Sequence, residues 1–390
     1  MKKIQLLLVL ILIVTMVLSL SVFISCKSTA ETTVAETTAA ETTAAQEIYK
    51  VRVGAAPYAM YFIWAAAHGL GLDAKFGVDL EVNNFASPTQ GTEAMVRGDL
   101  DLTSSGITDH LSVIKGAPEV KFFSTLGFFQ GYFFVGRVGE IKPWVELKEE
   151  MGGDLAKAKE FRLNEFKGKT FCVIALKKDL VLDTVGQIGL TEKDITIKIF
   201  ADDQKAATAF LSGEGDFYTG SLPQQTNLVK MTDKFVDAGG GEILGPAGLW
   251  YDTMASTDKF MKDNHEAALR TLATLYASIN FFDKDPQAFA EVAAAKLSEA
   301  TGSPFTVDEY IEFQTKYDDF LSIEQANEGF YNKDSDFYWK LPAEYTLKGM
   351  VAQGVLDSST KLEDYYSDGE NLFKELQERA DLMELIEAEK

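Results

Sequence analysis

One stretch of this 390-residue chain occurs twice, and it limits the possible folds more than any other feature. The sequence Ala-Met-Val-Arg-Gly-Asp-Leu-Asp-Leu-Thr-Ser-Ser at 94–105 has a partner, Ala-Phe-Leu-Ser-Gly-Glu-Gly-Asp-Phe-Tyr-Thr-Gly, at 209–220, so the offset is 209 − 94 = 115. The same offset relates 79–82 to 194–197 upstream without a gap. In each copy an alternating strand leads to an apolar helix end, a glycine, an aspartate and a second short strand. Two copies of one βαβ-like unit predict two similar lobes with a ligand between them.

Charge and residue content argue against several classes of function. The formal net charge is −22, and such a surface repels nucleic acid, so we expect no nucleic-acid partner. The chain has two cysteines and three scattered histidines, which do not suffice for a disulfide framework or a cysteine metal cluster. We therefore expect no metal and no cofactor, and interpret Cys172, inside an apolar run, as a core thiol.

The N-terminus has the pattern of an export signal. Two lysines precede a long apolar run, which predicts a secretory signal peptide over 1–25. Cys26 follows as in a bacterial lipobox, in which the cysteine is lipidated and becomes the mature N-terminus. An uncleaved anchor helix is the alternative, because the run is nearly long enough to span a bilayer. Three Ala-Glu-Thr-Thr repeats follow within 26–47 and predict a flexible tether. In either case the rest of the chain lies outside the cytoplasm.

The folded part begins as an α/β pattern. Residues 50–54 alternate as a strand, and Pro57 opens a helical run that ends near Gly69. Tyr58 and Tyr61 lie at the start of this helix, beside the strand end, where α/β sheets place their ligands. With the first repeat unit, this arrangement predicts a parallel-sheet pattern.

An ordered series of short motifs carries a resemblance to a known family. The series includes the strand end at Gly54 and Pro57, Phe-Gly-Val-Asp at 76–79, Gly-Asp-Leu-Asp at 98–101, Phe-Lys-Gly-Lys-Thr at 166–170 and Gly-Glu-Gly-Asp at 213–216. In this order the motifs resemble the solute-binding proteins of ABC importers in the sulfonate, nitrate and thiamine-precursor group, over residues 51 to about 357. Residues 176–179 depart from the small residues usual there, and 142–162 is interpreted as a charged surface insertion.

The resemblance implies a fold and its division into lobes. The expected class is α/β, a two-lobed periplasmic binding protein type 2 fold, in which each lobe is a mixed, mostly parallel sheet flanked by helices. The ligand cleft lies between the lobes. We expect lobe 1 to comprise 48–135 and 246–390, and lobe 2 to comprise 136–245. Two chain crossings, near Gly136 and Gly245, favour closure about a hinge.

Polar residues at the strand ends are the first group of candidate ligand contacts. Loops rich in Ser, Thr and Gly at helix starts leave free N–H groups that attract anions or carbonyl oxygens. The predicted donors are Ser104, Ser105, Thr219 and Ser221. For each of them the alternative is an N-cap that serves only its own helix.

Aromatic residues form the second group. Those predicted to enclose the solute are Tyr58, Tyr61, Tyr132 and Trp250, while the phenylalanines at 122, 123, 128 and 129 are interpreted as core. Gln130, between a phenylalanine and a glycine, is a candidate contact, as is Lys177, which could pair with an acidic solute or remain solvated.

The resemblance implies a binding protein and no enzyme. We expect an extracytoplasmic, lipid-anchored monomer that captures a small organic solute and delivers it to an ABC permease. A sulfonate, a nitrate-like anion and a pyrimidine or thiamine precursor remain open as ligands, with a slight preference for a solute that has an aromatic or apolar part. The alternatives are a pyrimidine-synthase-like enzyme of the same superfamily, whose cysteine-rich iron motif is missing here, and a sensor subunit that reports the solute to a membrane kinase.

Overall fold

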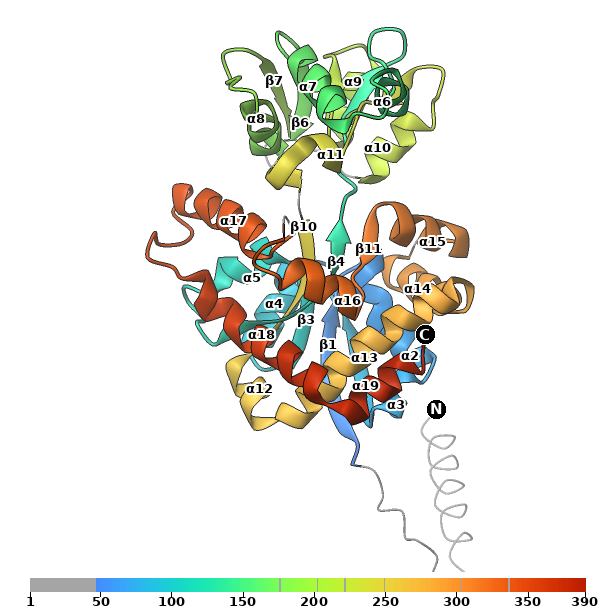
Figure 1. Ribbon diagram of the computed structural model, residues 1–390, viewed down its shortest axis with the longest axis vertical. Helices are drawn as coiled ribbons and strands as arrows, with labels where there is room; N and C mark the ends of the chain where they lie inside the picture. The colour runs from blue at the N-terminus through green and yellow to red at the C-terminus, as the bar shows by residue number, and fades with distance from the viewer. Residues whose placement is uncertain are drawn as a thin grey trace, which may run out of the picture. The chain divides into compact units, whose positions relative to one another are not determined.

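The computed structural model describes residues 47–174, 177–201, 203–220, 222–248, 250–302, 304–335 and 337–390. The predicted signal peptide, Cys26 and nearly all of the predicted tether lie outside these residues. The described strands form two separate sheets (Figure 1). Among the described residues, no helix has the length and apolar character needed to cross a membrane.

The first sheet has six strands in the order β11-β4-β10-β3-β1-β2. Strands β2, β1, β3 and β4 run in one direction, and β10 and β11 run in the other. The bounds are β1 Tyr49–Ala55, β2 Val78–Asn84, β3 Leu102–Gly106, β4 Val120–Phe129, β10 Trp250–Thr257 and β11 Asp318–Phe320. We call this sheet and the helices packed on it lobe 1.

The second sheet has five strands in the order β7-β6-β8-β5-β9, and only β5 runs against the others. The bounds are β5 Val135–Arg137, β6 Thr170–Ile174, β7 Thr196–Phe200, β8 Phe217–Tyr218 and β9 Phe235–Asp237. We call this sheet and its helices lobe 2. Strand β4 leads into lobe 2, and β10 begins where the chain returns (Figure 1).

The repeated sequence forms the same unit in both lobes. In lobe 1 the unit is β2, helix α4 (Pro88–Val96) and β3, and its two strands pair with either edge of β1. In lobe 2 it is β7, helix α9 (Asp203–Leu211) and β8, whose strands pair with either edge of β6. Both bounds of α9 are those of α4 shifted by the offset of the sequence repeat, 203 − 88 = 115 and 211 − 96 = 115.

The aspartate that ends the repeated motif has one structural role in both copies. Asp101 Oδ2 accepts the backbone N–H of Arg52, at 2.8 Å, and also the Arg52 guanidinium. Its equivalent, Asp216, accepts the backbone N–H of Thr170 at 2.8 Å and lies 3.3 Å from the Lys169 ammonium. Because each carboxylate satisfies an N–H of the central strand, the motif fixes the βαβ backbone.

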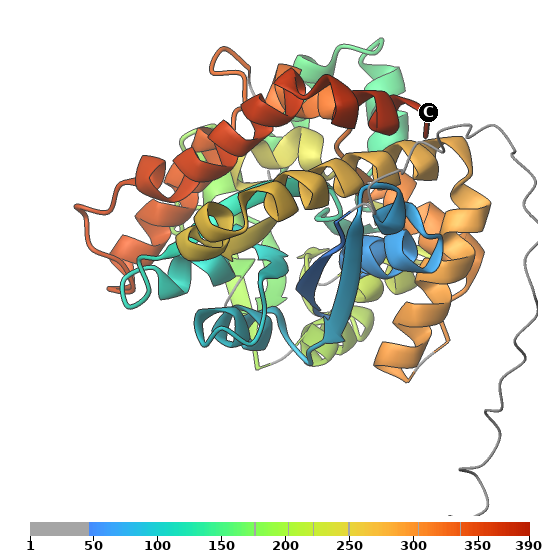
Figure 2. The same ribbon diagram turned by 90° about the horizontal axis from the view of Figure 1, so that it is seen from below.

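Helices cover both faces of the lobe 1 sheet, and two apolar cores lie beneath them. One face is covered mainly by α13, α14 and α2, and the other by α4, α5, α17 and α18. Figure 2 shows α13 and the C-terminal helices α18 and α19 side by side. The helices of this lobe are η1 Ala59–Phe62, α2 Ile63–Gly69, α3 Leu72–Lys75, α4, α5 Ile107–Val113, α12 Asp258–Asp263, α13 His265–Lys284, α14 Pro286–Thr301, α15 Val307–Lys316, α16 Ile323–Gln325, η4 Ala326–Phe330, α17 Lys340–Ala352, α18 Leu362–Glu378 and α19 Ala380–Glu387.

Lobe 2 has two smaller cores, one of which uses the segment interpreted from sequence as a surface insertion. Its helices are α6 Trp144–Glu150, α7 Leu155–Glu165, α8 Lys178–Gly186, α9, α10 Leu222–Val229, α11 Gly241–Leu244 and η3 Gly245–Gly248. Trp144, Leu147 and Leu163 from α6 and α7 are buried in the core on the β6 strand. The insertion prediction was therefore wrong: the apolar side of these two helices completes lobe 2.

Candidate functional site

A cavity of about 570 Å³ is lined by residues from both lobes, at the place where the chain passes between the two sheets. Lobe 2 contributes Ile174, Lys177, Asp203 and Leu222, and Tyr132 comes from the first link. The remaining lining residues belong to lobe 1: Pro57, Tyr58, Ala59, Tyr61, Pro88, Gly106, Asp109, Phe129, Trp250, Asp252, Leu297, Thr301, Pro304, Phe305, Phe313 and Asp318.

Three neighbouring strands of lobe 1 form the floor of this cavity. Trp250 on β10 and Asp318 on β11 both pair with Phe129 on β4, so the three residues form one row. Asp252 lies two residues beyond Trp250, and alternation along the strand places both side chains on the same face. It pairs with Gly127, where an added Cβ would lie 2.3 Å from both Asp319 O and Met60 Cε. Gly127 therefore packs directly against the backbone of β11 and the end of the Met60 side chain.

Two buried carboxyl groups meet on the floor. Asp252 and Asp318 are 7% and 3% exposed, and their carboxyl groups lie within hydrogen-bonding reach of each other. Tyr61 donates its hydroxyl to Asp252 Oδ1 at 2.6 Å. Burial raises the pKa of Asp252 to about 6, and burial together with the Asp252 charge raises the pKa of Asp318 well above its usual range. These raised pKa values favour a proton shared between the two carboxyl groups over two negative charges.

Aromatic side chains surround the carboxyl pair. The Tyr58 and Tyr61 rings meet edge to face with centroids 5.7 Å apart, and Phe129 and Tyr132 do so at 4.7 Å. Trp250 lies against the end of β3, because a Cβ added at Gly106 would be 2.4 Å from its ring. These faces suit an apolar or flat part of a solute.

Lobe 2 brings one cationic side chain to the cavity. The Lys177 ammonium lies 3.2 Å from the centroid of the Tyr132 ring and is 8% exposed. Burial lowers the pKa of Lys177 to about 7, against the opposing effect of the Asp203 charge. Asp203, the first residue of α9, accepts a hydrogen bond from the Tyr218 hydroxyl at 2.7 Å.

A further carboxylate lies in the wall of lobe 1. Asp109, in the first turn of α5, accepts hydrogen bonds from the Ser105 hydroxyl at 2.8 Å and from the Thr89 hydroxyl at 2.9 Å. Two donors hold this side chain in place, so its charge is fixed at the cavity edge.

The structure brings five of the predicted contacts together in the cavity, and they are Tyr58, Tyr61, Tyr132, Lys177 and Trp250. Ser221 lies outside the described residues, as does the predicted lipidation residue Cys26.

The other four predicted contacts do not line this cavity. Ser104 is fully buried and accepts the indole N–H of Trp64 at 3.1 Å, and Ser105 reaches the cavity only through Asp109. Thr219 is buried against the side chain of Gln225, which also accepts the N–H of Gly220. Gln130 is exposed. We therefore do not carry these four into the proposed site.

Sequence reasoning missed the acidic residues of the site, which are Asp109, Asp203, Asp252 and Asp318. One signal was available: Asp252 interrupts a buried β-strand, where an ionisable residue needs a reason. Phe129 was interpreted as a core residue, but it also lines the cavity.

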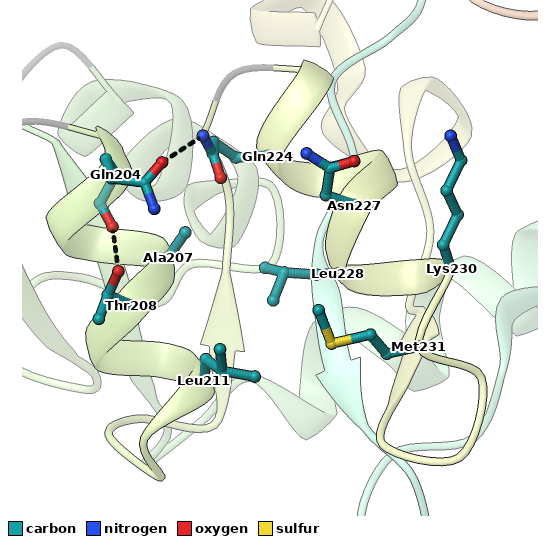
Figure 3. A pocket seen from close by; sticks show the side chains of 9 residues that line it. All are labelled: Gln204, Ala207, Thr208, Leu211, Gln224, Asn227, Leu228, Lys230 and Met231. Carbon is teal, nitrogen blue, oxygen red and sulfur yellow. Dashed lines mark hydrogen bonds between the residues drawn. The ribbon is translucent and has the colours of Figure 1, made fainter.

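A second hollow and a cluster of possible metal ligands lie elsewhere on the molecule, and neither combines residues of both lobes as the cavity does. A hollow of about 510 Å³ lies between α9 and α10, where the Gln224 amide donates to the Gln204 side chain at 2.8 Å (Figure 3). It involves lobe 2 alone and contains none of the predicted contacts. In lobe 1 the side chains of His68, Asp73 and Asp79 lie close enough to hold a metal ion. The Asp73 carboxylate already accepts the backbone N–H groups of Ala74 and Leu80, which is a structural role.

Comparison with known proteins shows likeness of structure. No protein-family model matches the chain, and no curated protein matches it significantly. The periplasmic aliphatic sulphonate-binding protein SsuA of Escherichia coli superimposes with a TM-score of 0.58 at 14% identity, covering 84% of this chain and 99% of that one. The putative sulfonate ABC transporter, periplasmic sulfonate-binding protein SsuA of Methylobacillus flagellatus KT gives 0.57 at 14% identity, with 86% and 97% covered.

An enzyme shares the same architecture. The desulfurization enzyme DszB superimposes with a TM-score of 0.52 at 12% identity, covering 85% of this chain and 99% of that one. At these identities the likeness concerns the fold. The predicted fold class is confirmed: the chain has the α/β, two-lobed fold of these periplasmic binding proteins.

Proposed function

We propose that this chain is the extracytoplasmic solute-binding component of an ABC importer and captures a small organic solute between its lobes. The observation that carries the proposal is the cavity of about 570 Å³, to which both lobes contribute polar and aromatic side chains. Its volume lies in the range of small-molecule sites, and its position at a junction of two lobes is typical of them.

Closure about the two links is the proposed mechanism. Lobe 2, proposed to span 136–245, moves toward lobe 1, proposed to span 48–135 and 246–390. The solute is then enclosed between Lys177 and Asp203 on one side and the floor of lobe 1 on the other. The permease is proposed to dock on the rims of both lobes when they are closed. The closed form is proposed to bind the permease as a monomer.

The experiment is a ligand screen coupled to a measurement of closure. Purified protein is examined for co-purifying small molecules by mass spectrometry after denaturation, and candidate solutes are then titrated by calorimetry. Small-angle scattering with and without the bound solute should show a smaller radius of gyration with it. If sulfonates, nitrate, pyrimidines, amines and related compounds all fail to bind, the capture function is wrong.

Anchoring is a separate proposal with its own test. We propose that residues 1–25 are removed and that Cys26 is lipidated, which tethers the protein at the membrane face. A Cys26→Ala variant should leave the membrane fraction, and the intact protein should carry the mass of a diacylglyceryl group on Cys26. A protein that stays in the membrane fraction after this substitution would favour the uncleaved anchor helix.

An enzyme is the second candidate, because DszB shares the fold. The described cysteine does not support thiol chemistry in the cavity. Cys172 lies on β6, does not line the cavity, and has a pKa raised to about 11 by burial. A sensor subunit would bind solute in the same way. Deletion of the gene, followed by uptake measurement with the identified solute, distinguishes import from sensing.

A further inference from the structure

We propose that the solute is a compact nitrogen base, which presents two or more N–H donors, usually with a positive charge, on a flat or apolar body. Oxyanions such as sulfonates and nitrate bind more weakly at the same site. The inference rests on the proposed function and names the chemical class that the cavity selects.

The cavity floor carries an unpaired hydrogen-bond acceptor. Asp318 Oδ1 is buried and has no hydrogen-bond partner among the described residues. On its neighbour Asp252, Oδ1 accepts the Tyr61 hydroxyl. Two buried carboxyl groups that receive few hydrogen bonds are costly, so the pair is suited to accept hydrogen bonds from a solute that enters. Adjacent N–H donors, as in an amidinium or a protonated aminopyrimidine, meet two neighbouring carboxyl groups and replace the proton that they share.

The charged side chains around the cavity are mostly acidic. Among the described lining residues, the acidic side chains are Asp109, Asp203, Asp252 and Asp318, and the basic one is Lys177. Asp109 and Asp203 are held by hydroxyl donors, so their carboxylates stay at the cavity edge. Lys177 lies on the Tyr132 ring, which already stabilises its charge. A bound oxyanion would face the carboxylates with one cation to oppose them, whereas a base gains from each of them.

Aromatic side chains line the cavity next to the carboxyl pair. Trp250 and Phe129 lie in the same row as Asp318, and the Tyr61 hydroxyl is bonded to Asp252. A cation over a ring face is attracted by the ring, and a flat heterocycle also stacks there. The site thus combines acceptors with aromatic faces, the pattern expected for an organic base.

The test compares two probes that share a phenyl ring and differ in charge. Benzamidine and benzenesulfonate are titrated at pH 7.5, with 4-aminopyrimidine and nitrate as a second pair. We expect each base to bind at least about 10-fold more tightly than its partner anion, and the co-purifying molecule, when present, to be a base. If an anion binds more tightly, the charge inference is overturned while the capture function stands. If neither bases nor anions bind and no closure is seen, the capture function fails as well.

Variants locate the effect on the floor. Asp252→Asn keeps the shape and the bond from Tyr61 and should weaken benzamidine at least about 10-fold without weakening benzenesulfonate. Asp319→Asn is the matched control, because Asp319 is the next residue after Asp318 on β11 and does not line the cavity. Asp318→Asn provides the second variant if Asp252→Asn does not fold. Equal losses in the Asp252 and Asp319 variants would overturn the assignment of the floor as the base-binding element.

Discussion

The two copies of the repeated unit occupy equivalent places at the cavity but carry different chemistry there. Pro88 begins α4 and Asp203 begins α9, their numbers differ by the offset of the sequence repeat, 203 − 88 = 115, and both line the cavity. In lobe 1 that place is apolar, and the charge comes from α5, β10 and β11 instead. In lobe 2 the same place is an acid beside Lys177. The comparison shows that the duplicated backbone sets where a solute is held, while side chains that the two copies do not share set which solute is held.

The largest expected effect tests the equivalence of the copies. Asp101→Ala should lower the free energy of unfolding by about 3 kcal/mol and Asp216→Ala by about 2 kcal/mol. Both remove the acceptor of a central-strand N–H, but Asp101 also binds the Arg52 guanidinium through two N–H groups. Urea unfolding of each variant measures the difference. Asp99→Ala is the control, since Asp99 is exposed and pairs with the exposed Arg97. A loss in only one copy would show that the two units are not equivalent.

The second prediction concerns stability and pH. The pKa of Asp252 is raised to about 6, against about 3.9 in an unfolded chain, so the folded chain holds this proton more tightly. That contribution is complete below about pH 4 and is lost as the pH rises through 6. Asp252→Asn cannot ionise and should be more stable than the wild type at pH 7.5 by about 1–3 kcal/mol, with the gap closing at pH 4.5.

Urea unfolding at the two pH values measures that gap. A variant that is less stable at both pH values would make Asp252 a structural group. A gain in stability together with a loss in benzamidine binding is the pattern of a residue kept for function at the expense of stability.

The third prediction sharpens the contrast between the acidic floor and the cation of lobe 2. At pH 6.5, where Lys177 is mostly charged, Lys177→Met should strengthen benzamidine binding by about 3- to 4-fold, because it removes a like charge from the cavity. Lys178→Met is the matched control, since Lys178 pairs with Glu192 at 2.8 Å and does not line the cavity.

The wild type should also respond to pH in this region. The pKa of Lys177 is lowered to about 7, so its charge is lost as the pH rises from 6.5 to 8.5, and benzamidine affinity should rise over that range. Calorimetry at three pH values checks this. The Lys177→Met variant should lack the rise, and an unchanged slope in that variant would assign it to another group.

The smallest effect concerns the rim, where the lobes also touch. The Tyr345 hydroxyl on α17 donates to the Asp183 carboxylate on α8. Both residues are near the surface, and such contacts contribute little, so Tyr345→Phe should change solute affinity by less than about 3-fold. Titration with benzamidine measures the change. A loss above 10-fold would mean that the rim, and not the cavity, drives closure.

Sequence predicted the backbone of the site better than its chemistry. The offset repeat gave both βαβ units, because periodicity and glycine stops are local signals. It also suggested Ser104 and Thr219, which are buried in equivalent strands of the two lobes against Trp64 and Gln225. Their hydroxyls are satisfied within the protein, and no local pattern reveals a partner that lies far along the chain.

The acidic floor was missed for the same reason. Asp252 and Asp318 are brought together by β10 and β11, which pair with either edge of β4. The row exists only once the sheet order is known, and the short β11 strand does not have a clear alternating pattern. By contrast Tyr58, Tyr61 and Trp250 were predicted because strand ends and helix starts are visible in the sequence.

The pairing of Phe129 with Trp250 has a mechanical consequence. Phe129 ends β4 and Trp250 begins β10, so both connections to lobe 2 leave the six-stranded sheet at a single spot, and that spot is also part of the cavity floor. A solute bound there contacts the strand ends through which the two lobes are connected. Under the proposed closure, lobe 2 rotates about these two strand ends, so the bound solute lies where the two lobes move least relative to each other.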